Sequence, residues 1–141
     1  MKSQVESMAE GCRAIRFLPF RPAGEIPLVL SSGDMHVVTV KRGLEGVVVP
    51  SKLYPTLAAG RPVLGVAPEE SDVVRIIRRT GCGIAANPDD PNSVAEAIRN
   101  VLHDTEQLQT MARRAREISF SYDRVKQLKI FSETLEEAVR G

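Results

Sequence analysis

Short apolar runs alternate with helical periods over the first 103 residues of the chain. Four runs, each bounded by glycine, proline or aspartate, predict buried strands at residues 14–17, 35–40, 63–66 and 83–86. Parallel strands cannot be joined by tight turns, so strands that alternate with helices indicate helical crossovers. The pattern therefore predicts an α/β fold with a parallel sheet of about four strands and helices on both faces.

Helix boundaries are marked by capping residues. Ser71 is expected to cap a helix that ends before Gly81, with Val73, Val74 and Ile77 as its apolar stripe. Asp90 and Pro91 predict the start of a second helix, with a stripe at Val94, Ile98, Val101 and Leu102.

No strand pattern follows residue 103. Two or three C-terminal helices are expected at 104–141, with stripes at Leu108, Met111, Ala112 and Ala115 and then at Val125, Leu128, Phe131 and Leu135. The chain therefore divides into an α/β part at 1–103 and C-terminal helices at 104–141.

Composition narrows the class of protein. The formal net charge is only +1, whereas nucleic-acid-binding proteins carry a broad basic surface. The charge balance therefore argues against binding of nucleic acid. No apolar run approaches the roughly 20 residues that span a bilayer, so we expect a cytoplasmic protein. Cys12 and Cys82 show no metal-ligand spacing and are expected to be ordinary buried or half-buried thiols.

The loop at residues 41–54 follows a predicted strand, and ligands of parallel sheets collect at such carboxyl ends. Ser51 is expected to cap a helix running to Ala59, and Lys52 would add a positive charge beside the free amides of the first turn. Pro55 would leave the N–H groups of Lys52, Leu53 and Tyr54 available. A diphosphate would fit there, although a plain cap and a solvated lysine fit these residues as well.

The other polar residues are weaker candidates for a functional site. Glu45, which lies in the sequence Gly-Leu-Glu-Gly, could accept hydrogen bonds from sugar hydroxyls or simply face water. His36, in an apolar strand, fits a satisfied core histidine, and His103 fits a helix end. The sequence has no catalytic triad pattern and no metal-ligand spacing.

The stretch GLEGVVVPSKLYPTLAAGRPVLGV at 43–66 resembles the donor-binding domain of retaining glycosyltransferases with the GT-B architecture of two Rossmann-like domains. Residues 17–40 and the stretch GCGIAANPDDPNSVAEAI at 81–98 are similar to the flanking parts of that domain. The likeness is greatest to family 4-like enzymes that transfer amino sugars into bacterial surface polysaccharides. It implies a partial C-terminal nucleotide-sugar-binding domain at 1–141.

The resemblance also implies roles for individual residues. Ser51 and Lys52 would contact the donor's diphosphate, Glu45 and Gly46 the sugar, and Tyr54 the nucleotide. A loop around Phe20 and Arg21 would lie against the base. Such enzymes bind a nucleotide diphosphate sugar without an essential metal, and they stabilise the leaving group electrostatically.

Two departures from the family qualify these expectations. Pro55 stands where many members carry a ribose-binding glutamate. The family's first two strands and its acceptor-binding N-terminal domain have no counterpart here, so an inactive fragment with exposed strand edges is expected. We expect residues 14–17 either to join the strand at 35–40 or to leave an edge through which the chain self-associates.

Two other classes remain open at this stage. Sugar-nucleotide 2-epimerases share the two-domain architecture and would also hold a nucleotide diphosphate. A non-enzymatic donor-binding subunit would instead require a separate partner chain.

Overall fold

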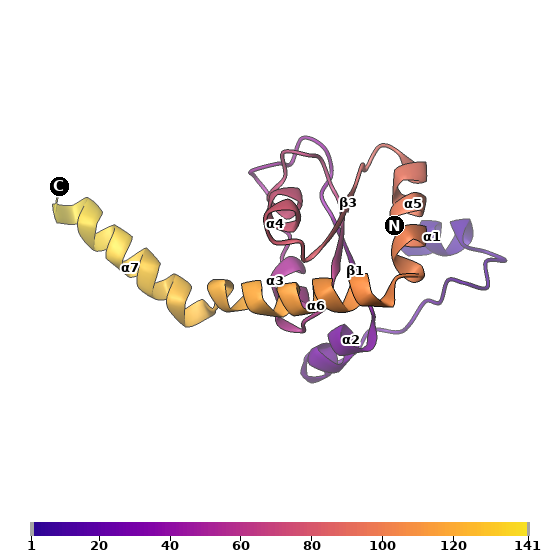
Figure 1. Cartoon of the computed structure of the whole chain (residues 1–141), viewed down its shortest axis with the longest axis horizontal. Coiled ribbons are helices and arrows are strands. Elements are labelled where there is room, and N and C mark those ends of the chain that lie inside the picture. The colour runs from indigo at the N-terminus through magenta and orange to yellow at the C-terminus, as the bar shows by residue number, and fades with distance from the viewer. Residues whose placement is uncertain (1, 141) are drawn as a thin grey trace.

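The computed structural model describes residues 2–140, and a parallel sheet lies at its centre (Figure 1). The strands are β1 (His36–Thr39), β2 (Val63–Val66) and β3 (Gly83–Ala86), in the spatial order β1-β2-β3. In the register, His36 faces Val63, which faces Gly83. The α/β class and three of the predicted strands are confirmed, but the sheet has three strands in place of the expected four.

β2 is the central strand, and its surroundings explain its sequence. Val63 and Leu64 are at most 1% exposed, which suits a strand covered on both faces. On the neighbouring strand, a Cβ atom at Gly83 would overlap the backbone carbonyl of Val63. Glycine at this position therefore permits the close approach of β3 to β2.

Helices cover both faces of the sheet, as predicted. One core lies between the sheet and the helices α3 (Leu53–Ala58), α4 (Asp72–Thr80) and α6 (Thr105–Ser119). A smaller core on the opposite face joins Leu64 and Ala86 to Ala97 of α5 (Pro91–Leu102). α3 connects β1 to β2, and α4 connects β2 to β3, so both crossovers run in the same direction across the sheet. Because crossovers between parallel strands are right-handed, α3 and α4 lie on the same face.

The boundaries of α4 and α5 follow the predicted caps. Ser71 Oγ accepts a hydrogen bond from the N–H of Val74 at 3.3 Å, and Gly81 ends α4 at φ 64°. Asp90 accepts from the N–H of Asn92 at 2.9 Å and begins α5. Local chemistry alone therefore sets these ends.

The expected strand at residues 14–17 is wrong. This segment lies between α1 (Lys2–Met8) and the short helices η1 (Ala23–Glu25) and α2 (Ile26–Ser32), and every residue from 10 to 24 is exposed. Ile15 and Phe17 are 51% and 42% exposed, and no strand runs beside them among residues 2–140. A run without a neighbouring strand cannot form ladder hydrogen bonds, so the segment does not join β1.

The chain ends in two helical elements beyond α6, namely η2 (Phe120–Tyr122) and α7 (Arg124–Arg140). The C-terminal helices are therefore confirmed, and Met111 and Ala115 of α6 are buried as predicted. In contrast, α7 buries no residue and projects away from the body of the molecule (Figure 1). Its predicted stripe does not pack against the sheet.

The remaining sequence predictions about individual residues have mixed outcomes. Cys82 is buried, but Cys12 is exposed, because it lies in the segment that packs against nothing. Nε2 of His36 lies 2.7 Å from the carbonyl of Leu30, which is a satisfied structural histidine, and His103 is the exposed C-cap of α5. Within residues 2–140, no helix has both the length and the apolar character that crossing a bilayer requires.

Candidate functional site

A cleft of about 350 Å³ opens at the carboxyl edge of the sheet. It is lined by the end of β3, by residues that follow each of the three strands, and by one side chain from α4: Arg42, Ala67, Pro68, Glu69, Glu70, Arg78, Ala85, Ala86 and Asn87. Loops that follow parallel strands converge at this edge, which is the usual ligand-binding position of an open α/β sheet.

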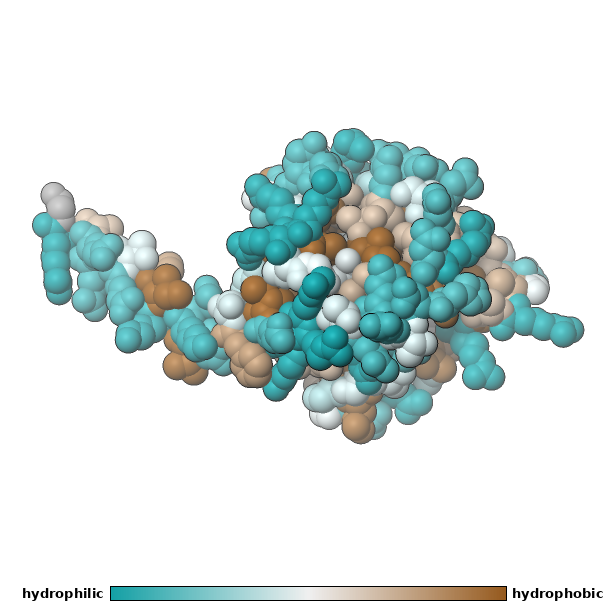
Figure 2. All heavy atoms as spheres, viewed as in Figure 1, coloured by the Kyte–Doolittle hydropathy of each residue, from teal (hydrophilic) through white to brown (hydrophobic). Residues whose placement is uncertain are grey.

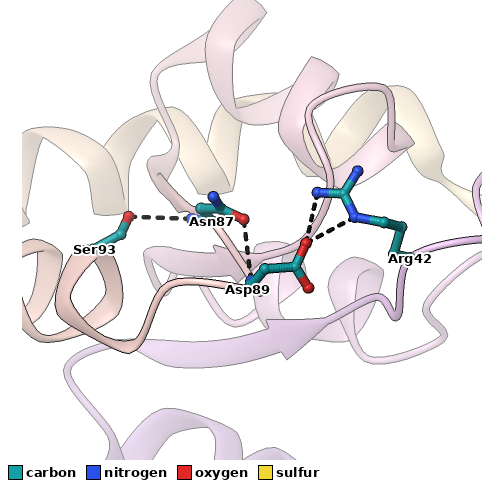
Figure 3. A network of polar contacts seen from close by, with 4 residues as sticks. All are labelled: Arg42, Asn87, Asp89 and Ser93. Carbon is teal, nitrogen blue, oxygen red and sulfur yellow. Dashed lines mark hydrogen bonds and ion pairs between the residues drawn. The ribbon is translucent and has the colours of Figure 1, made fainter.

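A hydrogen-bonded network joins the loops after β1 and β3 at this cleft (Figure 3). Nε and Nη2 of Arg42 each lie 2.7 Å from Oδ2 of Asp89. The N–H of Asp89 donates to Oδ1 of Asn87 at 3.0 Å, and the N–H of Asn87 donates to the hydroxyl of Ser93 at 3.2 Å. The Asn87 and Ser93 contacts hold the loop that presents Asp89 to Arg42.

The electrostatics of the cleft depend on paired charges near its surface. The hydrogen bond and the charge of Asp89 raise the pKa of Arg42, and Glu70 and Glu45 add smaller contributions in the same direction. Nη2 of Arg78 lies 2.7 Å from Oε2 of Glu69 in a second exposed pair. The cleft therefore presents two guanidinium groups, each paired with an exposed carboxylate.

The predicted role of Ser51 as a helix cap is wrong. The N-cap of α3 is Lys52, in the right-handed helical conformation, and no side chain caps the helix. The carbonyl of Pro50 accepts a hydrogen bond from the N–H of Leu53 at 3.0 Å, so a backbone turn occupies a donor that was expected to be available. The N–H of Leu53 is consequently unavailable to a ligand.

Ser51 and Lys52 nevertheless remain accessible at this end of α3. Both are exposed, whereas Leu53, which follows them, is fully buried. In the described part of the chain, no protein acceptor bonds the N–H of Lys52 or of Tyr54. Two of the three expected amide donors are thus free.

Glu45 and Gly46 lie in the same loop, between β1 and α3. Gly46 has φ 73° and Gly43 has φ 85°, a left-handed conformation that favours glycine. Turn hydrogen bonds from the N–H groups of Leu44 and Val47 close the loop at 3.2 Å. Glu45 is half-buried, and its charge is felt by Arg42.

Tyr54 is engaged in packing. Its ring lies 5.0 Å from that of Tyr122 of η2, tilted by 60°, and this contact ties α3 to the C-terminal helices. Burial, followed by smaller contributions from Tyr122 and Asp72, raises the pKa of Tyr54. Contact between Tyr54 and a nucleotide stays a prediction.

Phe20 and Arg21 lie elsewhere. They line a separate hollow of about 630 Å³ with Leu28 and Val29 of α2, and Phe20 is fully exposed. Since α2 leads directly into β1, this hollow is on the amino side of the sheet (Figure 1). The structure does not bring these two residues to the cleft.

Sequence reasoning missed the charged residues Arg42 and Arg78 of the cleft, and Asp89, which pairs with Arg42. The rule that selected the loop after β1 applies equally to the loops after β2 and β3. Applied to each strand, it would have found Glu69 and the Asn87–Asp89 turn. The pairing of Arg42 with Asp89, 47 positions apart, has no signal in the sequence.

Residues 2–140 contain no group of three or more histidine, cysteine, aspartate or glutamate side chains arranged to hold a metal ion.

Comparison with known proteins gives partial matches to two named transferases. The chain is 33% identical over 95 residues to "Probable glycosyltransferase WbjE" of Pseudomonas aeruginosa, a match covering 67% of this chain and 24% of that protein. It is 30% identical over 104 residues to "Putative colanic acid biosynthesis glycosyl transferase WcaI" of Escherichia coli K12, a match covering 72% of this chain and 26% of that protein. No protein-family model matches the chain.

These matches span about a quarter of the length of each relative. They support a relationship to glycosyltransferases in general. Over most of its length, this α/β chain is similar to part of two bacterial proteins named as glycosyltransferases.

Proposed function

We propose that this chain is the donor-binding portion of a retaining GT-B glycosyltransferase that uses a nucleotide diphosphate sugar in the synthesis of a surface glycan. The cleft at the carboxyl edge of the sheet, with Arg42 and Arg78 in its lining, is the observation that carries the proposal. Similarity to two named glycosyltransferases supports the same class of reaction.

The charges of the cleft suit exchange of a carboxylate for a diphosphate. The Arg42 and Asp89 side chains are 60% and 58% exposed, so solvent screens their pairing and the pair is held weakly. A diphosphate carries more negative charge than one carboxylate and offers several acceptor oxygens to a guanidinium. A diphosphate could therefore compete with Asp89 for Arg42.

In this proposal, the Lys52 ammonium and the free N–H groups of Lys52 and Tyr54 form a second contact with the diphosphate. α3 has only six residues, so its dipole is small, and the Lys52 ammonium would provide most of the attraction. The Ser51 hydroxyl would donate to a phosphate oxygen, while Glu45 and the flexible backbone of Gly46 would meet the sugar hydroxyls.

The chemistry in this proposal is the departure of a nucleoside diphosphate. Arg42 and Lys52 would stabilise its developing charge, which is the main catalytic contribution expected of such a site. The acceptor would be held by a second domain outside this chain, so the isolated chain would bind the donor without transferring sugar. No essential metal is proposed.

Calorimetric titration with uridine, guanosine and thymidine diphosphates tests the proposal. We expect one diphosphate to bind and the matching nucleoside without phosphates to bind far more weakly. Lys52→Ala and Arg42→Ala should each weaken binding about 10- to 100-fold. Arg113→Ala, on exposed α6 surface outside the cleft, is the matched control and should leave the affinity unchanged.

Two results would reject this assignment. One is the absence of binding by all three diphosphates to the folded chain. The other is binding that both Lys52→Ala and Arg42→Ala leave unchanged, because the anion would then bind elsewhere.

A further inference from the structure

An ion pair joins the loops of two strands that do not pair with each other. Arg42 follows β1 and Asp89 follows β3, whereas β2 lies between these strands. The pair therefore spans the carboxyl end of the central strand, where the buried residues Ala67 and Pro68 line the cleft. The loops that follow the strands lie at the top of the body in Figure 1, and hydrophilic residues cover the same end in Figure 2.

Neighbouring contacts fix the loop that carries Asp89. Its N–H donates to Oδ1 of Asn87 at 3.0 Å, and the N–H of Asn87 donates to the hydroxyl of Ser93 at 3.2 Å. On the other side, Asp90 begins α5 by accepting a hydrogen bond from the N–H of Asn92. Because the loop is held on both sides, little conformational entropy is lost when the carboxylate of Asp89 forms an ion pair.

The pair occupies a part of the guanidinium that an anionic ligand would also use. Nε and Nη2 of Arg42 each lie 2.7 Å from Oδ2 of Asp89. These two nitrogens form one edge of the planar group, and such edges donate paired hydrogen bonds to phosphate oxygens. A diphosphate must therefore displace Asp89 before it can bind this edge of Arg42.

We propose that Asp89 is an internal competitor that limits the affinity of the cleft, so that a bound diphosphate opens the Arg42–Asp89 pair. This inference rests on the proposed function, because the competing ligand is the diphosphate assigned there. The pair is closed in the free chain, and its opening releases the loop after β3 from the loop after β1. An affinity is reduced by the fraction of the protein that is unable to bind, so loss of the Asp89 charge should tighten binding.

Calorimetric titration of Asp89→Asn with uridine, guanosine and thymidine diphosphates tests the competition. Asparagine keeps the size of the side chain and the N–H that bonds Asn87, but it carries no charge. The diphosphate that binds the wild type should bind Asp89→Asn about two- to fivefold more tightly at low salt, which is the range that an exposed ion pair allows. This ratio should fall as salt is added, because salt screens exposed charges.

A double-mutant cycle separates competition for Arg42 from a general effect of charge. In the Arg42→Ala background, Asp89 has no guanidinium to occupy, so Asp89→Asn should leave the affinity nearly unchanged. Glu70→Gln is the matched control, because Glu70 lines the same cleft and acts on Arg42 through its charge without an ion pair. Its effect should be smaller than that of Asp89→Asn and should persist in the Arg42→Ala background.

Two results would overturn the competition and leave the proposed diphosphate site intact. One is equal or weaker binding by a folded Asp89→Asn, because Asp89 would then hold Arg42 in place for the ligand or take no part in binding. The other is a gain in affinity that persists in full in the Arg42→Ala background, because it would then come from the loss of charge alone. Absence of binding by both the wild type and Asp89→Asn would instead reject the site, and the competition with it.

Discussion

Arg42 is held by one carboxylate oxygen of Asp89, and both side chains remain more than half exposed. Ser71 behaves differently, because the residue is 2% exposed and its hydroxyl accepts a hydrogen bond from a buried amide. A surface ion pair can exchange partners with little cost, whereas a buried hydrogen bond cannot be lost without leaving a donor unsatisfied. Burial therefore distinguishes side chains that can exchange a protein partner for a ligand from side chains that stabilise the fold.

The two cysteines give a prediction at this scale. Burial raises the pKa of Cys82, so its reactive thiolate is disfavoured at neutral and mildly alkaline pH, whereas Cys12 is exposed. Ellman's reagent at pH 8 should modify one thiol per folded chain rapidly and the second only on unfolding. Cys12→Ser should abolish the rapid phase, and rapid modification of both thiols in the native chain would contradict the burial of Cys82.

The helices of this chain begin in two ways. α4 begins with a side-chain cap from Ser71, whereas α3 begins after a turn in which the Pro50 carbonyl serves the N–H of Leu53. A serine stands one residue before α4 and two residues before α3. Only the structure shows which serine caps, because a backbone acceptor can replace a hydroxyl.

These two serines form a matched pair of variants. Ser71→Ala should lower the free energy of unfolding by about 1 kcal/mol, since the N–H of Val74 loses its acceptor. Ser51→Ala should change it by no more than a few tenths of a kcal/mol, because no cap bond is lost. Urea denaturation measures both values, and equal losses would contradict the assigned start of α3.

The whole molecule has a packed centre and two poorly packed ends. The buried residues cluster around β1–β3, α3–α6 and the connections between them. α1, η1, α2 and α7 contain none for which burial is described. Local unfolding is easiest where few apolar contacts oppose it, so stability should differ strongly along the chain.

Hydrogen exchange tests this distribution. Amides of residues 3–34 should exchange at least about 100-fold faster than those within α4, because their helices lack buried contacts. Mass spectrometry of peptic fragments gives both rates in one sample. Slow exchange at 14–17 would indicate ladder hydrogen bonds and would favour the strand expected from the sequence.

The sequence predicted those parts of the fold that depend on local chemistry. Caps at Ser71 and Asp90 and the stop at Gly81 are confirmed, because each requires only residues within one turn. The strand at residues 14–17 was wrong because a strand exists only beside another strand. The loop after β1 contributes Arg42 to the cleft, but Arg78, which also lines the cleft, and Asp89, which pairs with Arg42, come from distant parts of the chain.

The sequence by itself determined the α/β class, three strands, both ends of α4 and the start of α5, since hydrophobic period and capping act over a few residues. Tertiary structure decided which apolar segments are buried. β2 is covered by the elements around it, whereas α7 buries no residue. It also brought together the charges of the cleft. Burial and pairing are properties of the space around a side chain, and that space is formed by residues far away in the sequence.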